Sequence, residues 1–444
     1  MPEKYKKVIT IRKHCKILNM LEEKMDTGNT YEVRDMKLAG QGLLNIEYAE
    51  SKMGSLLEIR KRFIKEKPLA GVRVGLALHI TKETAVLVRT LIAGGADVAI
   101  TGCNPLSTQD DVAAALAKEG VKVYGYKGEN SEDYYKYLNK IIEFKPNITI
   151  DDGCDLVSEI HKKHTELIPS IIAGCEETTT GVIRLNAMEK DNALKYPMIA
   201  VNDNDTKHLL DNYYGTGQST CDGIIRATNV LFAGKTVVTA GYGSCGKGFA
   251  LRARGLGANV IVTEINPFRA LQAVYDGFRV MKMEDAAPLG EIFCTLTGDK
   301  HVIRLEHMRK MKSGAIMANS GHFDIEIDIA GLKKASSATK RVRPFLDEFV
   351  LDGKNLYICG EGRLVNLAAA EGHPSEVMAT SFCGQALAVE YAVKHRGKLP
   401  VKVIQLPKEI DDNIALLQLS ALSVKIDTLT EEQKKYLSGW EEGT

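Results

Sequence analysis

The chain has 444 residues, of which 44% are hydrophobic and 26% are charged, and its net charge is +1. This length predicts two or three domains with large cores, and the balanced charge argues against a nucleic-acid partner. No apolar run approaches the roughly 18 to 20 residues that span a bilayer, and the N-terminus lacks the apolar core of a signal peptide. We therefore expect a cytoplasmic protein with no membrane partner.

The cysteines and histidines give no sign of a metal centre. The nine cysteines form no Cys-x-x-Cys pair and their number is odd, which is typical of reduced intracellular thiols. His161 and His164 lie between lysines with no third ligand in sequence, so a solvated helix face is the simpler interpretation. We expect no bound metal.

The chain begins with an arm, residues 1–30, that is rich in lysine and arginine and to which we assign no function. A first α/β domain follows. Residues 72–78 form a predicted strand, 82–93 a helix and 97–101 a second strand, and this alternation is typical of a parallel sheet. We assign the substrate-binding domain to residues 31–203, completed by 375–406.

Polar side chains follow the predicted strands of this first domain. His79 and Thr81 end one strand, and Asp152 and Glu177 come directly after two others. In open α/β sheets ligands bind beyond the carboxyl ends of the strands, so these side chains predict a cleft for a polar small molecule.

Lys207 and Asp211 stand between the two halves of the chain, four residues apart and on one face of a predicted helix. A surface salt bridge is the common outcome for such a pair. Their position next to a polar cleft and a cofactor site favours a second interpretation, in which a lysine in a closed cleft is tuned for proton transfer.

Residues 236–264 carry a dinucleotide fingerprint. A β-branched strand, residues 236–240, leads into Gly241-Tyr-Gly-Ser-Cys-Gly, and residues 249–256 are a predicted helix. Gly241 allows a tight turn, Gly243 lets the backbone approach a pyrophosphate, and Gly246 lets the helix pack close to the strand. The helix N-terminus favours the phosphates.

A second strand, residues 259–263, ends at Glu264, eighteen residues past Gly246. Its carboxylate can accept hydrogen bonds from both ribose hydroxyls and would repel a 2′-phosphate, which selects NAD over NADP. Arg269 leaves some tolerance for a phosphate.

Further strands are predicted over 292–297 and 356–359, and His322 follows another. A lone histidine such as His322 is usually a loop residue whose ring nitrogens are hydrogen-bonded and which has no catalytic role. We assign the NAD-binding Rossmann domain to 204–374 and a C-terminal oligomerisation segment to 407–444. The predicted fold is α/β, with two doubly wound parallel-sheet domains and a short C-terminal segment.

Ten ordered motifs together resemble one family, from about Tyr31 to the C-terminus. The chain is similar to S-adenosyl-L-homocysteine hydrolases. The motifs are His79-Ile-Thr-Lys-Glu-Thr-Ala, Asn104-Pro-Leu-Ser-Thr-Gln-Asp, Asp151-Asp-Gly-Cys-Asp-Leu, Glu176-Glu-Thr-Thr-Thr-Gly, Asn202-Asp-Asn-Asp-Thr-Lys, Asp211-Asn-Tyr-Tyr-Gly, Gly241-Tyr-Gly-Ser-Cys-Gly-Lys-Gly, Gly321-His-Phe-Asp-Ile-Glu-Ile, Gly362-Arg-Leu-Val-Asn-Leu and Gly372-His-Pro-Ser.

The resemblance implies hydrolysis of a thioether with a tightly held NAD and no net redox change. NAD⁺ oxidises the ribose 3′-hydroxyl, which acidifies the C4′ hydrogen; homocysteine then leaves from C5′, water adds, and the ketone is reduced again. It also implies a homotetramer built as two pairs. The partners are S-adenosylhomocysteine, adenosine or inosine, and homocysteine.

The resemblance also implies a role for each matched residue. Lys207 with Asp211 handles the 3′-hydroxyl proton, Asp152 and His79 handle protons at C4′, the leaving sulfur or the incoming water, and Glu177 holds the ribose hydroxyls. His322 and Asn366 complete the site around substrate and nicotinamide. Beyond Gly241, Gly243, Gly246, Glu264 and Arg269, the positions implied to bind NAD are Thr178, Thr179, Thr180 and Asn212, and those implied to hold the purine are Thr81, Glu83 and His373.

Several positions depart from the family pattern. Thr216 stands where a cysteine is frequent, Arg269 where an asparagine is frequent, and Glu371 where methionine is frequent. The chain also lacks the longer tail with which many members reach a neighbour's NAD site.

The purine leaves an alternative open. Glu83, if ionised, can accept from the adenine amine, yet N1–H of hypoxanthine lies one atom away, so S-inosyl-L-homocysteine is a second candidate substrate. Glu371 adds another expected acceptor near the base. We favour the adenosyl compound. Two other classes share the Rossmann half: a 2-hydroxy-acid dehydrogenase, which the strand-end motifs of the first domain disfavour, and an NAD-binding scaffold, which the acids and lysine of the cleft disfavour.

Overall fold

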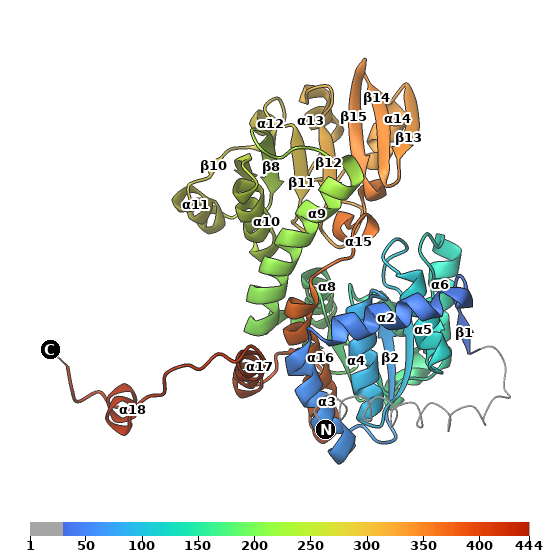
Figure 1. The fold of residues 1–444 in the computed structure, drawn as a ribbon, viewed down its shortest axis with the longest axis vertical. Coiled ribbons are helices and arrows are strands. Elements are labelled where there is room, and N and C mark those ends of the chain that lie inside the picture. Colours follow the sequence, from blue (N-terminus) through green and yellow to red (C-terminus); the bar gives the residue numbers. More distant parts are fainter. Residues whose placement is uncertain (1–29, 444) are drawn as a thin grey trace, which may run out of the picture.

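The computed structural model describes residues 30–443, so the arm predicted over residues 1–30 lies almost entirely outside the described residues. The chain folds around two eight-stranded sheets, which form the two lobes in Figure 1. Within the described residues no helix is long and apolar enough to cross a membrane.

The first sheet is parallel throughout, in the order β1-β4-β3-β2-β5-β6-β7-β16. The last strand of this sheet, β16, comes after all strands of the second sheet in the sequence, and it pairs with β7. The strands are β1 (Tyr31–Glu32), β2 (Arg73–Ala77), β3 (Asp97–Thr101), β4 (Lys122–Tyr124), β5 (Ile148–Asp151), β6 (Ala173–Glu176), β7 (Met198–Ala200) and β16 (Val403–Ile404).

Helices cover both faces of this sheet. One apolar cluster joins the sheet to α2, α3, α4, α5 and α16, and a second joins the opposite face to α6, α7 and α8. The predicted helix over 82–93 and the strand over 97–101 are confirmed with these bounds. The helices are α2 (Ala39–Glu50), α3 (Gly54–Glu66), α4 (Lys82–Ala93), α5 (Asp110–Lys118), α6 (Ser131–Glu143), α7 (Asp155–Lys163), α8 (Thr179–Lys190) and α16 (Ser375–Lys394).

The second sheet has the order β10-β9-β8-β11-β12-β15-β14-β13 and is also covered on both faces. Its strands are β8 (Thr236–Ala240), β9 (Asn259–Thr263), β10 (Arg279–Val280), β11 (Ile292–Thr295), β12 (Ile316–Asn319), β13 (Ala338–Arg343), β14 (Leu346–Leu351) and β15 (Lys354–Cys359). Its helices are α9 (Thr216–Thr228), α10 (Ser244–Gly255), α11 (Pro267–Tyr275), α12 (Met283–Ala286), α13 (Leu305–Lys310), α14 (Ile329–Ala335) and α15 (Val365–Ala368).

One edge of the second sheet is antiparallel, in addition to the predicted parallel arrangement. β13 pairs antiparallel with β14, and β14 pairs antiparallel with β15. The two-residue loop between β14 and β15 is Asp352-Gly353, and both residues have positive φ, +49° and +76°. An Asp-Gly turn of this kind reverses the chain directly, whereas a parallel neighbour needs a long crossover.

Two connections join the sheets. The first passes through η4 (Val201–Asp203) and η5 (Thr206–Gly215), which is a π-helix, into α9, and the second leaves α15 for α16. The carboxylate of Asp411 accepts from the backbone N–H groups of Asp205 and Thr206 at the start of η5. Asp411 lies on α17 (Lys408–Ala421), and α18 (Glu431–Ser438) lies on an arm that extends away from both lobes in Figure 1.

Candidate active site

A cavity of about 120 Å³ lies where the carboxyl ends of the two sheets face each other. All six residues predicted to be catalytic line it: His79, Asp152, Glu177, Lys207, Asp211 and His322. The predicted ligand-binding residues that line it are Thr81, Glu83, Thr178, Asn212, Asn366 and His373.

Asp152 lies between two imidazoles. Its Oδ2 is 3.3 Å from Nε2 of His79, and its Oδ1 is 3.4 Å from Nδ1 of His322. Burial lowers the pKa of His79 to about 4, although the Asp152 carboxylate acts in the opposite direction. His79 is therefore neutral near pH 7 and can either accept or donate a proton.

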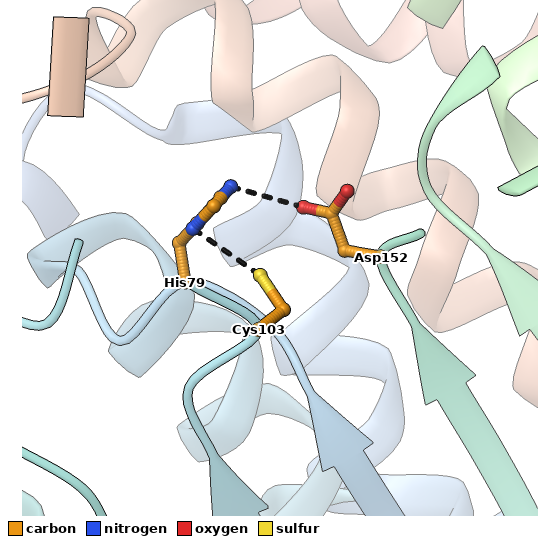
Figure 2. Close-up of side chains that lie close together, drawn as sticks. All are labelled: His79, Cys103 and Asp152. Atoms are coloured by element: carbon orange, nitrogen blue, oxygen red, sulfur yellow. Dashed lines mark hydrogen bonds and ion pairs between the residues drawn. The ribbon is translucent and has the colours of Figure 1, made fainter. Parts of the chain in front are cut away.

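The other nitrogen of His79 faces the first sheet. Nδ1 forms a hydrogen bond with Ser107 Oγ at 2.7 Å and lies 3.2 Å from Cys103 Sγ. Figure 2 shows that Cys103 and Asp152 contact different nitrogens of the ring. His79, Cys103 and Asp152 follow β2, β3 and β5, so three neighbouring strand ends supply this row of groups.

Cys103, His79 and Asp152 each offer a metal-ligand atom, and these atoms lie within 4.8 Å of one another. The two contacts use different nitrogens of the same ring, which makes a hydrogen-bonded chain rather than a shell around one ion. Burial raises the pKa of Cys103 well above its usual range, and the nearby carboxylates add to this.

Gly153 determines how closely the two lobes meet at this point. A Cβ at Gly153 would lie 2.2 Å from Nε2 of His322, and its φ is +104°. Only glycine combines that conformation with that space. His322, which comes from the loop after β12, reaches Asp152 because residue 153 has no side chain.

Lys207 and Asp211 form a buried pair and not a surface salt bridge. Lys207 Nζ lies 2.8 Å from Asp211 Oδ2 and donates to Asn212 Oδ1 at 2.7 Å. Burial alone would lower the pKa of Lys207, but the Asp211 and Glu177 carboxylates outweigh it and the pKa is raised. The lysine is therefore a cation in the resting site.

Glu177 is a second carboxylate near Lys207, with Oε1 3.6 Å from Nζ. Ser381 Oγ and Gln385 Nε2, both from α16, donate to its two oxygens. Burial raises the pKa of Glu177 and Lys207 opposes this shift. The carboxylate is held rigidly at the cavity wall by a helix that returns to the first sheet.

His373 also belongs to this group. Its Nδ1 contacts Asp211 Oδ1 and its Nε2 lies 3.2 Å from Thr216 Oγ1, so both ring nitrogens are engaged. Burial opposes ionisation of Asp211, yet Lys207 and then His373 lower its pKa overall. The ring of His373 therefore supports Asp211, which the predicted purine role did not foresee.

The glycine fingerprint has the geometry of a phosphate loop. Gly241 has a φ of +100°, and a Cβ on Gly246 would lie 2.0 Å from the carbonyl oxygen of Gly241. At Gly243, by contrast, a Cβ would meet only Nη1 of Arg269, 3.7 Å away. The space above Gly243 is open, and α10 begins at Ser244, five residues earlier than predicted. The prediction missed the first residues of α10 because glycine has a weak helix propensity. In the folded protein, close packing overrides that weak propensity.

Family models match both halves of the chain. The model described as S-adenosyl-L-homocysteine hydrolase matches residues 30–173, and that described as its NAD-binding domain matches residues 212–372. The chain belongs to the S-adenosyl-L-homocysteine hydrolase family. It is therefore a hydrolase with an NAD-binding domain.

Curated relatives match over nearly the whole chain. The S-inosyl-L-homocysteine hydrolase of Methanocaldococcus jannaschii is 59% identical over 93% of this chain and 100% of that protein. The adenosylhomocysteinase of Saccharolobus solfataricus is 56% identical over 94% of this chain and 100% of that protein, and the adenosylhomocysteinase of Aquifex aeolicus is 57% identical over 93% and 100%. Among solved structures, the 3-phosphoglycerate dehydrogenase of Entamoeba histolytica has a TM-score of 0.44 at 15% identity, over 76% of this chain and 100% of that chain.

The residues present in this chain are suited to binding the NAD that this hydrolase family uses. Asn366 donates to Ser219 Oγ, while its Oδ1 is buried without a partner among the described residues, which suits the amide of a nicotinamide. Glu264 accepts from the backbone of Tyr242, Ile265 and Asn266 at the end of β9. These bonds fix the carboxylate where it can meet a ribose.

The three threonines at the start of α8 lie where the first sheet approaches the second. Thr178 precedes α8 and lines the cavity, Thr179 Oγ1 donates to Asn202 Oδ1 at 3.3 Å, and Thr180 Oγ1 lies 3.3 Å from a Cβ position on Gly298. Gly298 follows β11 of the second sheet. These residues can therefore contact a cofactor bound to the other half of the hydrolase.

Two acids near the site support its backbone and do not face the cavity. Asp151 accepts from the N–H groups of Asp152 and Val157, and Glu176 Oε1 accepts from those of Gly153 and Thr178. Burial raises the pKa of Asp151 to about 7. They hold the loops that carry Asp152 and Glu177.

Sequence reasoning missed the groups that orient these side chains. Ser381 and Gln385 are four residues apart on a largely buried helix, which was a usable signal for a buried polar contact. Cys103 lies just before the Asn104-Pro-Leu-Ser-Thr-Gln-Asp motif and Ser107 lies within it, and no role was predicted for either residue. The apolar walls were also missed: Leu364, Leu367, Met378 and Phe382.

Proposed function

We propose that the protein catalyses the reversible hydrolysis of S-adenosyl-L-homocysteine to adenosine and L-homocysteine, with NAD bound throughout. The observation that carries this is the shared cavity, in which the buried Lys207–Asp211 pair and the His79–Asp152–His322 row line one space. Family membership gives the reaction, and the cavity supplies acid–base groups for more than one proton transfer.

NAD⁺, when bound, supplies a hydride acceptor for the hydrogen on ribose C3′ and returns the hydride at the end. Gly241, Gly243 and Gly246 would hold its pyrophosphate and Glu264 its ribose, with Arg269 above the loop. Thr178, Thr179, Thr180, Asn212 and Asn366 would complete that site.

Lys207, Asp211 and Glu177 handle the 3′-hydroxyl. The raised pKa of Lys207 means that it begins as a donor, so it can accept the hydroxyl proton only after its own proton moves to a neighbouring carboxylate. Glu177 lies 3.6 Å away for that transfer and burial raises its pKa, whereas Asp211, at 2.8 Å and with a lowered pKa, stays ionised beside the lysine. Glu177, held by α16, positions the ribose hydroxyls.

Asp152, His79 and His322 handle the second set of protons. Asp152 accepts the C4′ proton, and neutral His79 gives a proton to the leaving sulfur or takes one from the incoming water. His322 fixes the far side of Asp152. Thr81 and Glu83 bind the purine at the other end of the cavity.

The assembly and location are part of this proposal. We propose a cytoplasmic homotetramer whose chain divides into a substrate domain, 31–203 with 375–406, a Rossmann domain, 204–374, and an oligomerisation segment, 407–444. The eight described cysteines are all free, which suits a reducing compartment. On the C-terminal arm Trp440 is 91% and Leu437 67% exposed, so this segment has apolar surface for another subunit. Light scattering should give about four times 48.7 kDa.

The test uses purified holoenzyme and S-adenosyl-L-homocysteine. Homocysteine should appear while the total of bound NAD⁺ and NADH stays constant. Stoichiometric release of NADH into solution would instead indicate a dehydrogenase and overturn the proposal.

A further inference from the structure

Ser107 contacts the nitrogen of His79 that faces the first sheet. Its Oγ lies 2.7 Å from His79 Nδ1 and donates to the backbone carbonyl of Asn104 at 3.0 Å. Ser107 is buried and is not among the residues that line the cavity, whereas His79 is. Ser107 therefore acts on a bound substrate through the imidazole of His79.

These two hydrogen bonds decide which nitrogen of neutral His79 carries the proton. A serine hydroxyl has one hydrogen, and here it is directed to the Asn104 carbonyl. Ser107 Oγ then accepts from Nδ1, so Nδ1 carries the N–H group. Nε2 lies 3.3 Å from Asp152 Oδ2 but makes no hydrogen bond with residues 30–443, which leaves it as the unprotonated nitrogen.

The thiol of Cys103 does not take the place of this hydroxyl, although its Sγ lies 3.2 Å from the same Nδ1. Burial raises the pKa of Cys103 well above its usual range, so the group is a neutral thiol. A thiol is a weak donor and a weak acceptor. Among the described residues, only this sulfur would remain to accept from Nδ1–H if the hydroxyl of Ser107 were removed.

The position of this proton matters when a proton travels from C4′ to sulfur. Asp152 takes the C4′ proton and becomes a carboxylic acid, while the electron pair of the C4′–H bond forms the C4′–C5′ double bond and the pair of the C5′–S bond leaves with sulfur. Because Nε2 is unprotonated, it can accept the proton from Asp152, which makes His79 an imidazolium. Nε2 then gives the proton to sulfur, and His79 is neutral again with Nδ1–H still in place.

The surroundings of His79 favour a short-lived imidazolium. Burial lowers the pKa of His79 to about 4, the Asp152 carboxylate opposes this shift, and His322, His373 and Lys207 add to it. The ring therefore gives up its second proton readily. If the single proton of neutral His79 were on Nε2, that nitrogen could not accept from Asp152, and giving the proton away would leave an imidazolate anion.

We propose that Ser107 is a positioning residue that keeps the proton of neutral His79 on Nδ1, so that Nε2 passes a proton from Asp152 to the leaving sulfur. Water addition uses the same path in the opposite direction. The inference rests on the proposed function, because it concerns how protons move in that reaction.

The experiment measures two steps in wild-type holoenzyme and in Ser107→Ala. We expect kcat for homocysteine release from S-adenosyl-L-homocysteine to fall roughly ten- to a hundredfold, the usual cost of leaving a buried donor without a good acceptor. KM should stay within about threefold, because Ser107 does not contact the substrate. Formation of bound NADH after mixing with adenosine depends on Lys207 and Asp211, so its rate should also stay within about threefold. A general loss of structure would slow both steps.

Two further variants test the hydroxyl itself. Ser107→Cys keeps nearly the same volume but supplies a weak acceptor, so its kcat should fall at least about tenfold. Ser107→Thr keeps the hydroxyl and should retain more than about a third of the wild-type kcat. If the added methyl group of threonine prevents folding, the cysteine variant decides.

Ser170→Ala is the matched control. Ser170 Oγ donates to the carbonyl of Leu167, three residues earlier, at 2.7 Å, as Ser107 does to Asn104, but Ser170 lies just before the start of β6 and not at the cavity. Its loss should leave kcat within about threefold.

Three results would overturn the role of Ser107. They are a kcat within about threefold of wild type in Ser107→Ala or Ser107→Cys, an equal slowing of NADH formation in Ser107→Ala, and a folded Ser107→Thr variant that is as slow as the alanine variant. Failure of the wild type to release homocysteine would instead overturn the proposed function, and with it this inference.

Discussion

Lys207 Nζ and Asp211 Oδ2 lie 2.8 Å apart on a π-helix, with both side chains almost completely buried. A lysine and an aspartate four residues apart would usually share a solvated helix surface. Here the connection between the sheets places them in the cavity wall, where the pair can act on a substrate proton.

We expect Lys207→Ala to retain NAD while slowing the formation of bound NADH by about two to four orders of magnitude, the usual size of an acid–base contribution. Stopped-flow absorbance after mixing with adenosine measures that step. Lys408→Ala is a matched control, because Lys408 and Asp412 form the same i, i+4 pair at 2.7 Å on the surface. Near-normal reduction in Lys207→Ala would return this pair to a structural role.

Gly153→Ala should damage the row of His79, Asp152 and His322. The new methyl group would lie 2.2 Å from His322 Nε2, so His322 must move away from Asp152. Displacing a catalytic neighbour by about 1 Å can cost on the order of a hundredfold in rate.

Gly71→Ala separates backbone strain from this clash. Gly71 also has positive φ, +78°, but nothing lies within 4 Å of its Cβ position. It should lose stability with little change in kcat. Equal losses of kcat in both variants would contradict the steric role of Gly153.

Two glycines of the phosphate loop should respond differently to alanine. Gly243→Ala adds a methyl group to open space, so the protein should fold normally but bind NAD roughly ten- to a hundredfold more weakly, which corresponds to about 1 to 3 kcal/mol of lost contact. Gly246→Ala places its methyl 2.0 Å from a carbonyl oxygen and should destabilise the fold by about 1 to 3 kcal/mol or more. Apoprotein melting and NAD titration measure the two effects, and normal NAD affinity in Gly243→Ala would contradict the pyrophosphate site.

The low pKa of His79 predicts a loss of stability in acid. Its folded pKa of about 4 lies below the usual 6.5, so between these values the unfolded chain binds the proton more readily. The contribution of neutral His79 to the free energy of unfolding is complete above pH 6.5. It is lost as the pH falls toward 4, at no more than about 1.4 kcal/mol per pH unit.

His79→Gln should therefore reduce the fall in unfolding midpoint between pH 7 and pH 5. His301→Gln is the control, since that side chain is 44% exposed and lies in a loop of the second half. Denaturant unfolding at pH 5, 6 and 7 measures both variants. Identical pH profiles for wild type and His79→Gln would show that His79 is not buried in its neutral form.

The sequence by itself determined the elements and the chemistry at their ends. The strands over 236–240 and 259–263 and the helix over 82–93 have the predicted bounds, because β-branched runs, glycine turns and an N-cap threonine are local signals. The placement of polar residues after strands was also readable, since parallel strands bring their carboxyl ends to one edge. The Asp352-Gly353 hairpin was readable as well, although the sequence prediction did not use it.

Only the tertiary structure decided which of these side chains meet. Asp152 contacts His79 and His322, Asp211 contacts His373, and Lys82 contacts Glu371, across separations of more than 70 to nearly 300 residues. A sequence period reports which face of an element is buried, but it carries no information about the partner on that face. The pairings, and the pKa shifts that follow from them, depend on how two sheets pack around one cavity, because burial and charge proximity exist only after the chain has folded.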